Sequence, residues 1–272
     1  MKIALANSLA VTRSQGVETI DPATLANLVL YMSGADGSKV LDSGGSPANQ
    51  GDRIETWNDK SATGASFVSF DTTDATRPYY DKEKKALVFD DNGVDKELDW
   101  TGNLDLTGDY SFWLIMALGA DDFTPFFRND TDSETLVSIT NGQKPSIPAV
   151  SPSFQTDYIV DVGDYVCAGF NYDNSETTVR GFANGVFTNT VTGLTNDIIT
   201  SVGVLWKFLH SIEGHSSYIK CLVISDVVES DETMIGVSQW LMQEMGLGSV
   251  IDNVHELNFD DHENSMYVPM VF

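Results

Sequence analysis

Short runs of apolar and β-branched residues, separated by turn-forming residues, dominate the chain from residue 28 to residue 225. The run at 112–118 is apolar throughout, which predicts a central strand covered on both faces. No helical pattern separates the runs, so we expect antiparallel strands, and a sheet of this size must bury one face on a second sheet. The predicted strands cover residues 28–31, 86–89, 112–118, 136–139, 165–172, 178–183, 186–190, 202–206 and 218–225. The pattern therefore predicts an all-β fold, an antiparallel β-sandwich.

Asn184 and Gly185 give the strongest hairpin signal in the sequence. They separate two predicted strands by two residues. Asn-Gly is favoured in type I′ turns because both central residues of such a turn need a positive φ angle. We therefore predict a tight hairpin between residues 178–183 and 186–190.

One helix is predicted, from about residue 231 to residue 245. Ser230 or Asp231 suits its N-terminal cap, and Gly246 suits a left-handed stop after its last turn. Apolar residues recur at helical spacing and form one stripe, made of Met234, Val237, Leu241 and Met245. We expect this stripe to belong to the core, with the helix packed against an edge or end of the sandwich.

Two terminal segments flank the predicted sandwich, which spans residues 28–248. They are an N-terminal arm, residues 1–27, and a C-terminal tail, residues 249–272. The tail ends in an apolar segment of the kind that adds a strand to a neighbouring subunit or fills its groove. A tail that folds back on its own domain is the alternative, and the sequence favours neither. The residues of the predicted assembly arm are Met266, Tyr267, Val268, Met270, Val271 and Phe272.

Composition narrows the partners that this chain would bind. Hydrophobic residues make up 42% of its 272 residues, enough to build a sizeable core, while 40 acidic residues against 15 basic ones give a net charge of -25. Such a surface repels phosphate backbones and anionic lipids, so we expect no nucleic-acid partner and no membrane insertion. Polar residues interrupt the short apolar stretch at the N-terminus, so we expect synthesis without a classical export signal.

The two cysteines, Cys167 and Cys221, each lie within a strand-like apolar run. This placement favours two buried free thiols. A single disulfide is the alternative that the sequence leaves open.

Four segments occur in an order that matches a known family. They are residues 53–64, which contain a Trp, acid, Lys, Ser and Gly pattern; residues 75–80 with 86–98, which contain Arg-Pro followed by Leu-x-Phe-Asp; the hairpin at 180–185; and the helix that ends at 245–247. Together they resemble the concanavalin A-like lectin/glucanase (laminin-G-like) jelly-roll domains of the type found in bacteriophage virion proteins. The resemblance spans about residues 28–248 and implies a jelly-roll β-sandwich. It does not fix one function, because this fold includes lectins, glycosidases and structural modules.

Catalytic carboxylates are the first feature that would distinguish a glycosidase of this fold. Such enzymes carry acids on one strand face in a Glu-x-Asp-x-(x)-Glu pattern. The stretch at 97–100 lacks a third acid, and the stretch at 229–232 falls at the predicted helix cap, where its acids already have a structural role. We therefore expect a protein that is not an enzyme.

A loop rich in oxygen ligands suggests calcium as the one candidate cofactor. Hard oxygen donors cluster after the strand at 86–89, as calcium prefers, and many relatives bind calcium in loops. An ordinary turn explains the same residues and is the favoured interpretation. The candidate calcium ligands are Asp90, Asp91, Asn92 and Asp95.

The loop at 207–217 is the candidate contact site for a glycan or a protein. A lectin places exposed aromatic rings beside polar groups on a loop rim, and the same combination suits a protein interface. The candidate contact residues are Trp206, His210, His215 and Tyr218. Trp57 and Trp113 are instead predicted to lie in the core.

These observations favour a non-enzymatic structural protein of a virion, such as a head decoration, collar or tail-appendage subunit with a lectin-like outward domain. Its partners would be other capsid or tail subunits, and copies of the chain would form a homo-oligomer. It would be assembled into the virion in the host cytoplasm. The alternative is a carbohydrate-binding adhesin that recognises host surface glycans. A glycoside hydrolase is the third hypothesis.

Overall fold

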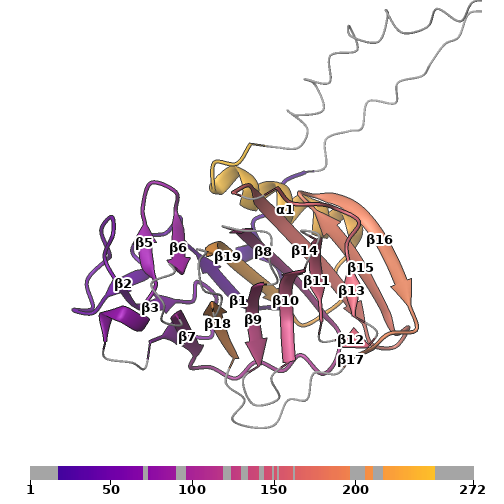
Figure 1. Cartoon of the computed structure of the whole chain (residues 1–272). Helices are drawn as coiled ribbons and strands as arrows, with labels where there is room; N and C mark the ends of the chain where they lie inside the picture. The colour runs from indigo at the N-terminus through magenta and orange to yellow at the C-terminus, as the bar shows by residue number, and fades with distance from the viewer. Residues whose placement is uncertain are drawn as a thin grey trace, which may run out of the picture.

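The computed structural model describes residues 18–69, 73–89, 96–118, 124–129, 134–140, 144–148, 150–151, 153–161, 163–196, 206–210 and 217–248. In this part of the chain two large antiparallel sheets face each other and one α-helix covers the outside of one of them (Figure 1). The predicted all-β jelly-roll sandwich with a single C-terminal helix is confirmed. No helix among these residues is long and apolar enough to cross a membrane.

Sheet A carries the helix, and its strands follow the order β16-β15-β14-β8-β19-β6-β5, with β1 paired to β19. Neighbours in this order are often distant in sequence, as β8 between β14 and β19 shows. The strands are β1 (Leu28–Ser33), β5 (Tyr79–Asp81), β6 (Ala86–Phe89), β8 (Tyr110–Leu118), β14 (Tyr165–Asp173), β15 (Thr178–Ala183), β16 (Val186–Thr192) and β19 (Ser217–Ser225).

Sheet B forms the opposite layer in the order β13-β11-β10-β9-β18-β7-β4-β3-β2. Its strands are β2 (Val40–Asp42), β3 (Ile54–Asn58), β4 (Ser66–Val68), β7 (Lys96–Trp100), β9 (Thr124–Asn129), β10 (Glu134–Thr140), β11 (Lys144–Ile147), β13 (Phe154–Gln155) and β18 (Trp206–His210). A small separate pair joins β12 (Val150–Ser151) to β17 (Thr195–Asn196), and two 3₁₀ turns occupy η1 (Pro22–Thr24) and η2 (Asp74–Thr76).

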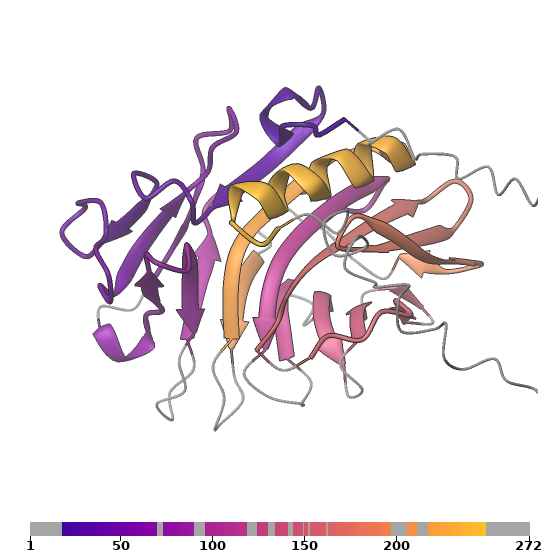
Figure 2. The same ribbon diagram turned by 90° about the horizontal axis from the view of Figure 1, so that it is seen from above.

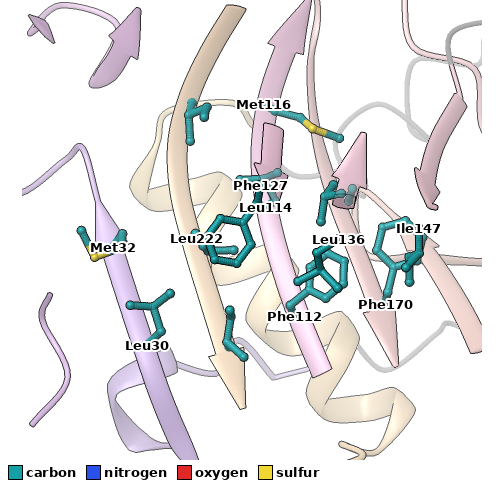
Figure 3. Packing of buried hydrophobic residues seen from close by; sticks show 14 of the residues in the cluster. Leu30, Met32, Phe112, Leu114, Met116, Phe127, Leu136, Ile147, Phe170 and Leu222 are labelled. Carbon is teal, nitrogen blue, oxygen red and sulfur yellow. The ribbon is translucent and has the colours of Figure 1, made fainter. Parts of the chain in front are cut away.

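The main core fills the space between the two sheets. Even-numbered residues of β8 enter it, and they meet side chains of sheet B such as Phe127 and Leu136 (Figure 3). Trp57 is also fully buried there, as predicted. Because one face of each of the long strands β8, β14 and β19 contributes to this layer, its burial supplies the main driving force for folding.

A second core lies between sheet A and the helix α1 (Asp231–Glu244). Odd-numbered residues of β8, Trp113 and Ile115, face the helix, and this explains why the run at 112–118 is apolar throughout. Figure 2 shows the helix lying along the curved face of the sheet. The predicted stripe is confirmed, since all four of its residues are buried, as is Trp113. The expectation of an edge or end position was wrong, because an apolar outer face on the central strands needs a cover along its length.

Both ends of α1 agree with the sequence prediction. The Ser230 side chain accepts a hydrogen bond from the amide of Thr233, and Gly246 adopts a positive φ of 71°. The hairpin prediction is also confirmed, because Asn184 and Gly185 have φ angles of 53° and 75° between β15 and β16. Local capping and turn chemistry therefore determined these boundaries.

The cysteines are both buried and free, as the sequence favoured. Cys167 on β14 and Cys221 on β19 are each opposite Ile115, which lies on β8 between them. Two strand spacings separate them, roughly 9–10 Å, whereas a disulfide needs Cα atoms within about 7 Å. Burial raises the pKa of the Cys167 thiol to about 12.

Part of the predicted N-terminal arm lies along α1. The Ile20 amide donates a hydrogen bond to the carbonyl of Gly236 at 3.1 Å, and the Ile20 side chain packs on the second core. A Cβ at Gly236 would lie 2.7 Å from the carbonyl oxygen of Glu18, so glycine permits this approach. The division of the chain into an arm, a sandwich and a tail stays a prediction, because residues 1–17 and 249–272 lie outside the described part.

Candidate functional site

Two tyrosines lie side by side at one end of the helix-bearing face of sheet A. Tyr165 begins β14 and Tyr218 lies near the start of β19, and both are opposite Ala117 of β8. The small side chain of Ala117 leaves room above the central strand, and the two rings meet there edge to face, with centroids 6.2 Å apart. Tyr218 is one of the residues that the sequence predicted for glycan contact, and Tyr165 is the partner that it did not predict.

Lys220 makes a cation–π contact with the Tyr165 ring. The pairing of β19 with β8 shifts between Ile219 and Cys221, which leaves Lys220 as an extra residue in a β-bulge. The Lys220 ammonium lies 4.3 Å from the centre of the Tyr165 ring and donates a hydrogen bond to the carbonyl of Lys84. Burial, and secondarily the nearby charge of Lys85, lowers the pKa of Lys220 to about 8. The bulge thus fixes Tyr165 through a cation–π contact.

The turn between β5 and β6 brings two further lysines to the same end of the sheet. The Lys84 ammonium lies 4.9 Å from the centre of the Tyr218 ring, and Lys85 donates a hydrogen bond of 2.6 Å to the carbonyl of Glu244. This second contact places a cation at the C-terminal end of α1, where the helix dipole favours positive charge. The lysines therefore connect the tyrosine pair to the end of the helix.

Tyr165 also lines a cavity of about 350 Å³, together with residues of the segments 158–161 and 163–164, the β15–β16 hairpin and the end of α1. We call this cavity the tyrosine pocket. Its volume falls within the range of about 300–1,000 Å³ that is usual for small-molecule sites. The residues that line it and carry the argument below are Tyr158, Ile159, Asp161, Asp164, Tyr165 and Asn184.

Buried residues anchor the segment 156–161, which we call the pocket loop. Thr156 and Val160 are buried, and the Thr156 amide donates a hydrogen bond to the carbonyl of Pro145 at 2.9 Å. Between them Tyr158 and Ile159 face solvent, with exposed fractions of 38% and 58%. The loop is thus anchored at two points while its apolar tip stays outside the core.

Asn184 ties the pocket loop to the hairpin. Its Nδ2 donates a hydrogen bond to the Tyr158 hydroxyl at 3.0 Å, and its Oδ1 accepts one from the amide of Cys167 at 2.9 Å. The turn residue that the sequence singled out as a hairpin signal therefore also orients an aromatic ring of the pocket. Sequence reasoning missed this second role because Tyr158 is 26 residues away in the chain.

The pocket combines apolar surface with groups that bind hydroxyls. Tyrosine rings and Ile159 offer apolar surface, while two aspartates accept hydrogen bonds and an asparagine both donates and accepts them. Sugars present the matching chemistry, since a pyranose has apolar C–H faces and a rim of hydroxyl groups. Among the described residues no group of three or more His, Cys, Asp or Glu side chains is placed to hold a metal ion.

The acids that the sequence considered for catalysis have structural contacts. The Glu229 carboxylate accepts a hydrogen bond from the Ser225 hydroxyl, and Asp231 pairs with Arg180 at the start of α1. Glu97 and Asp99 alternate on β7 with Lys96, Leu98 and Trp100, so they point to the same face of sheet B, where Glu97 is partly exposed and Asp99 is buried.

The other residues predicted for function fall on different parts of the chain. Trp206 and His210 lie at the two ends of β18 in sheet B, whereas Tyr218 lies on β19 in sheet A. The candidate calcium ligands Asp90, Asp91, Asn92 and Asp95, together with His215, lie outside the described residues, as does the predicted assembly arm at 266–272. These assignments stay predictions.

The comparisons with known proteins show a similarity in fold and none in sequence. No protein-family model and no curated protein sequence matches the chain. Among solved structures, the binding domain of botulinum neurotoxin DC in complex with SialylT is similar at 8% identity and a TM-score of 0.52, over 79% of this chain and 52% of that one. The complex of this binding domain with rat synaptotagmin II gives 9% identity, a TM-score of 0.51 and the same two coverages.

A Trypanosoma rangeli sialidase is also similar, at 10% identity over 82% of this chain and 34% of that one, but its TM-score of 0.48 is too low to carry an argument. The chain spans about half the length of the neurotoxin binding domains. At these identities the likeness shows a shared β-sandwich fold and leaves the ligand to be argued from the pocket itself.

Proposed function

We propose that the protein is a non-enzymatic carbohydrate-binding domain and that the tyrosine pocket holds the glycan. The observation that carries this proposal is the pocket itself, where Tyr158, Ile159 and Tyr165 stand beside hydroxyl-binding side chains in one cavity. A monosaccharide unit would lay its apolar face on a tyrosine ring and direct its hydroxyls to Asp161, Asp164 or Asn184. The roles of Glu229 and Asp231 at the helix start support the absence of hydrolysis.

The charge of the pocket favours a neutral glycan. Asp161 and Asp164 line the cavity, and the whole chain has a net charge of -25, so a carboxylate-bearing sugar would be repelled. The similar neurotoxin domain was solved with SialylT, but this chain matches only 52% of it. We therefore expect this domain to prefer uncharged hexose units over sialylated ones.

A glycan array that contains neutral and sialylated oligosaccharides tests the proposal. We expect binding to neutral glycans, and we expect Tyr158→Ala or Ile159→Ser to weaken the affinity for the best of them at least about tenfold, which corresponds to about 1.4 kcal/mol. Val191→Ser, at an exposed apolar residue of β16 near the end away from the Asn184-Gly185 turn, is the matched control for Ile159→Ser and should leave affinity unchanged.

Two results would count against the proposal. The pocket would lose its role if a glycan bound equally well to wild type and to both pocket variants. Release of reducing ends from a bound glycan would replace the binding function by a hydrolase.

A location in a virus particle is a second proposal and rests on a different observation. Four segments, at 53–64, 75–80 with 86–98, 180–185 and 245–247, follow one another along the chain in the same order as in domains of bacteriophage virion proteins, which they resemble. The apolar residues 266–272 suit an arm that contacts capsid or tail subunits. Such a protein would carry its glycan-binding face outward and recognise the host surface. Mass spectrometry of purified particles from the source tests this location, and its absence from intact particles would contradict it.

A further inference from the structure

Strand β16 is the exposed end of sheet A. It is seven residues long and pairs with β15, and no described strand pairs with its other side. Figure 1 shows it as the outermost strand at the right of the molecule. Three of its apolar side chains are exposed, Val186 by 50%, Phe187 by 43% and Val191 by 37%.

The other sheet ends are short, carry charge or are covered. The free side of the six-residue strand β1 is covered by Asp59 and Lys60, because the Tyr31 amide donates a hydrogen bond to the Asp59 carboxylate and the Tyr31 carbonyl accepts one from the Lys60 amide. β5 has three residues and includes Asp81, β2 has three residues and includes Asp42, and β13 has two residues. Natural proteins protect sheet edges by short strands, charged side chains or prolines, because a long unpaired edge offers backbone groups to another chain. β16 has none of these three protections. Its one irregularity is a bulge at Thr188, where its register with β15 shifts, and residues 189–192 beyond the bulge pair regularly with β15.

Charge distinguishes β16 further. No charged residue occurs between Arg180 and Asp197, although the chain carries 40 acidic residues. A second copy of a protein with a net charge of -25 is repelled at most orientations. The repulsion is weakest where surfaces with few charges meet. β16 presents such a surface to an identical β16, since the Arg180 guanidinium, 5.3 Å from the centre of the Phe187 ring, is paired with Asp231.

We propose that β16 of one copy pairs antiparallel with β16 of a second copy and joins the two A sheets into one continuous sheet. A two-fold axis between the strands makes the contact self-complementary, as in most homodimers. Its Thr, Val and Phe side chains are those that stabilise cross-strand pairs. Seven residues bury less than the roughly 800 Å² per partner of a standard interface, so the dimer dissociates on dilution.

Light scattering of the full chain over a wide concentration range tests this pairing. We expect the mass to approach that of a dimer at high concentration and that of a monomer on dilution. The double variant Thr190→Lys, Thr192→Lys places two cations on the edge and should stay monomeric at every concentration. The charge-matched control Ala62→Lys, Gln243→Lys changes two exposed residues away from β16 and should dimerise like wild type.

A truncated chain that ends at residue 248 shows whether β16 pairs with the β16 of a second copy or with the C-terminal tail. The proposal requires this chain to dimerise as the full chain does. Loss of the dimer on truncation would overturn the proposal in favour of the C-terminal tail as the strand that pairs with β16. A monomeric full chain, or a dimer that survives the double lysine variant, would also overturn it. Because Tyr158 and Asn184 are unchanged in these variants, glycan affinity per chain reports on the pocket separately.

Discussion

Two regions of the molecule differ in whether their large apolar side chains are buried. Under α1, Trp113 and Val223 are fully buried and belong to a continuous second core. Beyond the helix, the exposed large apolar side chains of the described residues all fall in two places, the pocket loop and β16. The described part of the chain thus has a covered apolar region under α1 and an uncovered one at the pocket loop and β16.

The difference supports the proposal that the uncovered region binds a partner outside the domain. A hydrophobic patch left on the surface of a stable domain commonly marks a binding site. The fold has the means to cover apolar surface, as α1 shows, and it anchors the pocket loop by Thr156 and Val160 while leaving Tyr158 exposed. We therefore assign stability to the covered region and binding to the uncovered one.

The strongest test of this division is a pair of deletions of large aromatic side chains. Trp113→Ala empties the second core and removes the hydrogen bond from the indole to the carbonyl of Met234, so we expect a loss of about 3–5 kcal/mol in the free energy of unfolding. Tyr158→Ala should cost less than about 1 kcal/mol because the ring is partly solvated. Chemical denaturation measures both, and equal losses would remove the distinction between the regions.

A smaller effect is expected at Lys220, which borders both regions. Its pKa is about 8 in the folded protein against an ordinary value of 10.5, so between these pH values the unfolded chain binds a proton that the folded chain has released. Stability contributed by this group therefore rises with pH through that window, whereas below pH 8 the buried ammonium destabilises the fold.

Denaturation of wild type and Lys220→Met between pH 7 and pH 10 measures this contribution. We expect the free energy of unfolding of wild type to gain on that of the variant as the pH rises. Lys82→Met, which removes an exposed lysine of the neighbouring turn, should show no such change. Parallel curves for wild type and Lys220→Met would show that the ammonium is not desolvated in the fold.

The smallest effect is expected at the N-terminal cap of α1. Ser230→Ala removes the side-chain acceptor for the Thr233 amide, so we expect a loss of about 1 kcal/mol. Ser175→Ala, in the exposed turn before β15, is the matched control. It removes a solvent-exposed hydrogen bond from the Ser175 hydroxyl to Asp173, so its loss should stay below about 0.5 kcal/mol. Equal losses in the free energy of unfolding of the two variants would mean that the Ser230 cap does not stabilise α1.

The sequence predicted those parts of the fold that local chemistry specifies. The fully apolar run at 112–118, the Asn184-Gly185 turn and the Ser230 cap each appear within a few residues. Short strands such as β7 escaped prediction because polar residues, among them Lys96 and Glu97, occupy them. Their pairing comes from the neighbouring strands rather than from their own pattern.

The pocket could not be read from the sequence because distant segments build it. Tyr165 and Tyr218 meet only because β8 lies between β14 and β19, and Lys220 reaches Tyr165 only through a bulge. Tyr158 and Ile159 lie in a segment with no strand or helix pattern, where exposed and buried apolar residues look alike. Tyr218 was the one residue whose aromatic character beside polar neighbours drew attention to this end of the sheet.

The most direct test of the division between covered and uncovered regions is a titration of isotope-labelled protein with the best neutral oligosaccharide, followed by amide chemical shifts. We predict saturable shifts for Ile159, Asn184 and Tyr165, with little change at Trp113 and Val223 under the helix. Saturable shifts confined to other surfaces, or none at glycan concentrations that bind on the array, would contradict the assignment of binding to the tyrosine pocket.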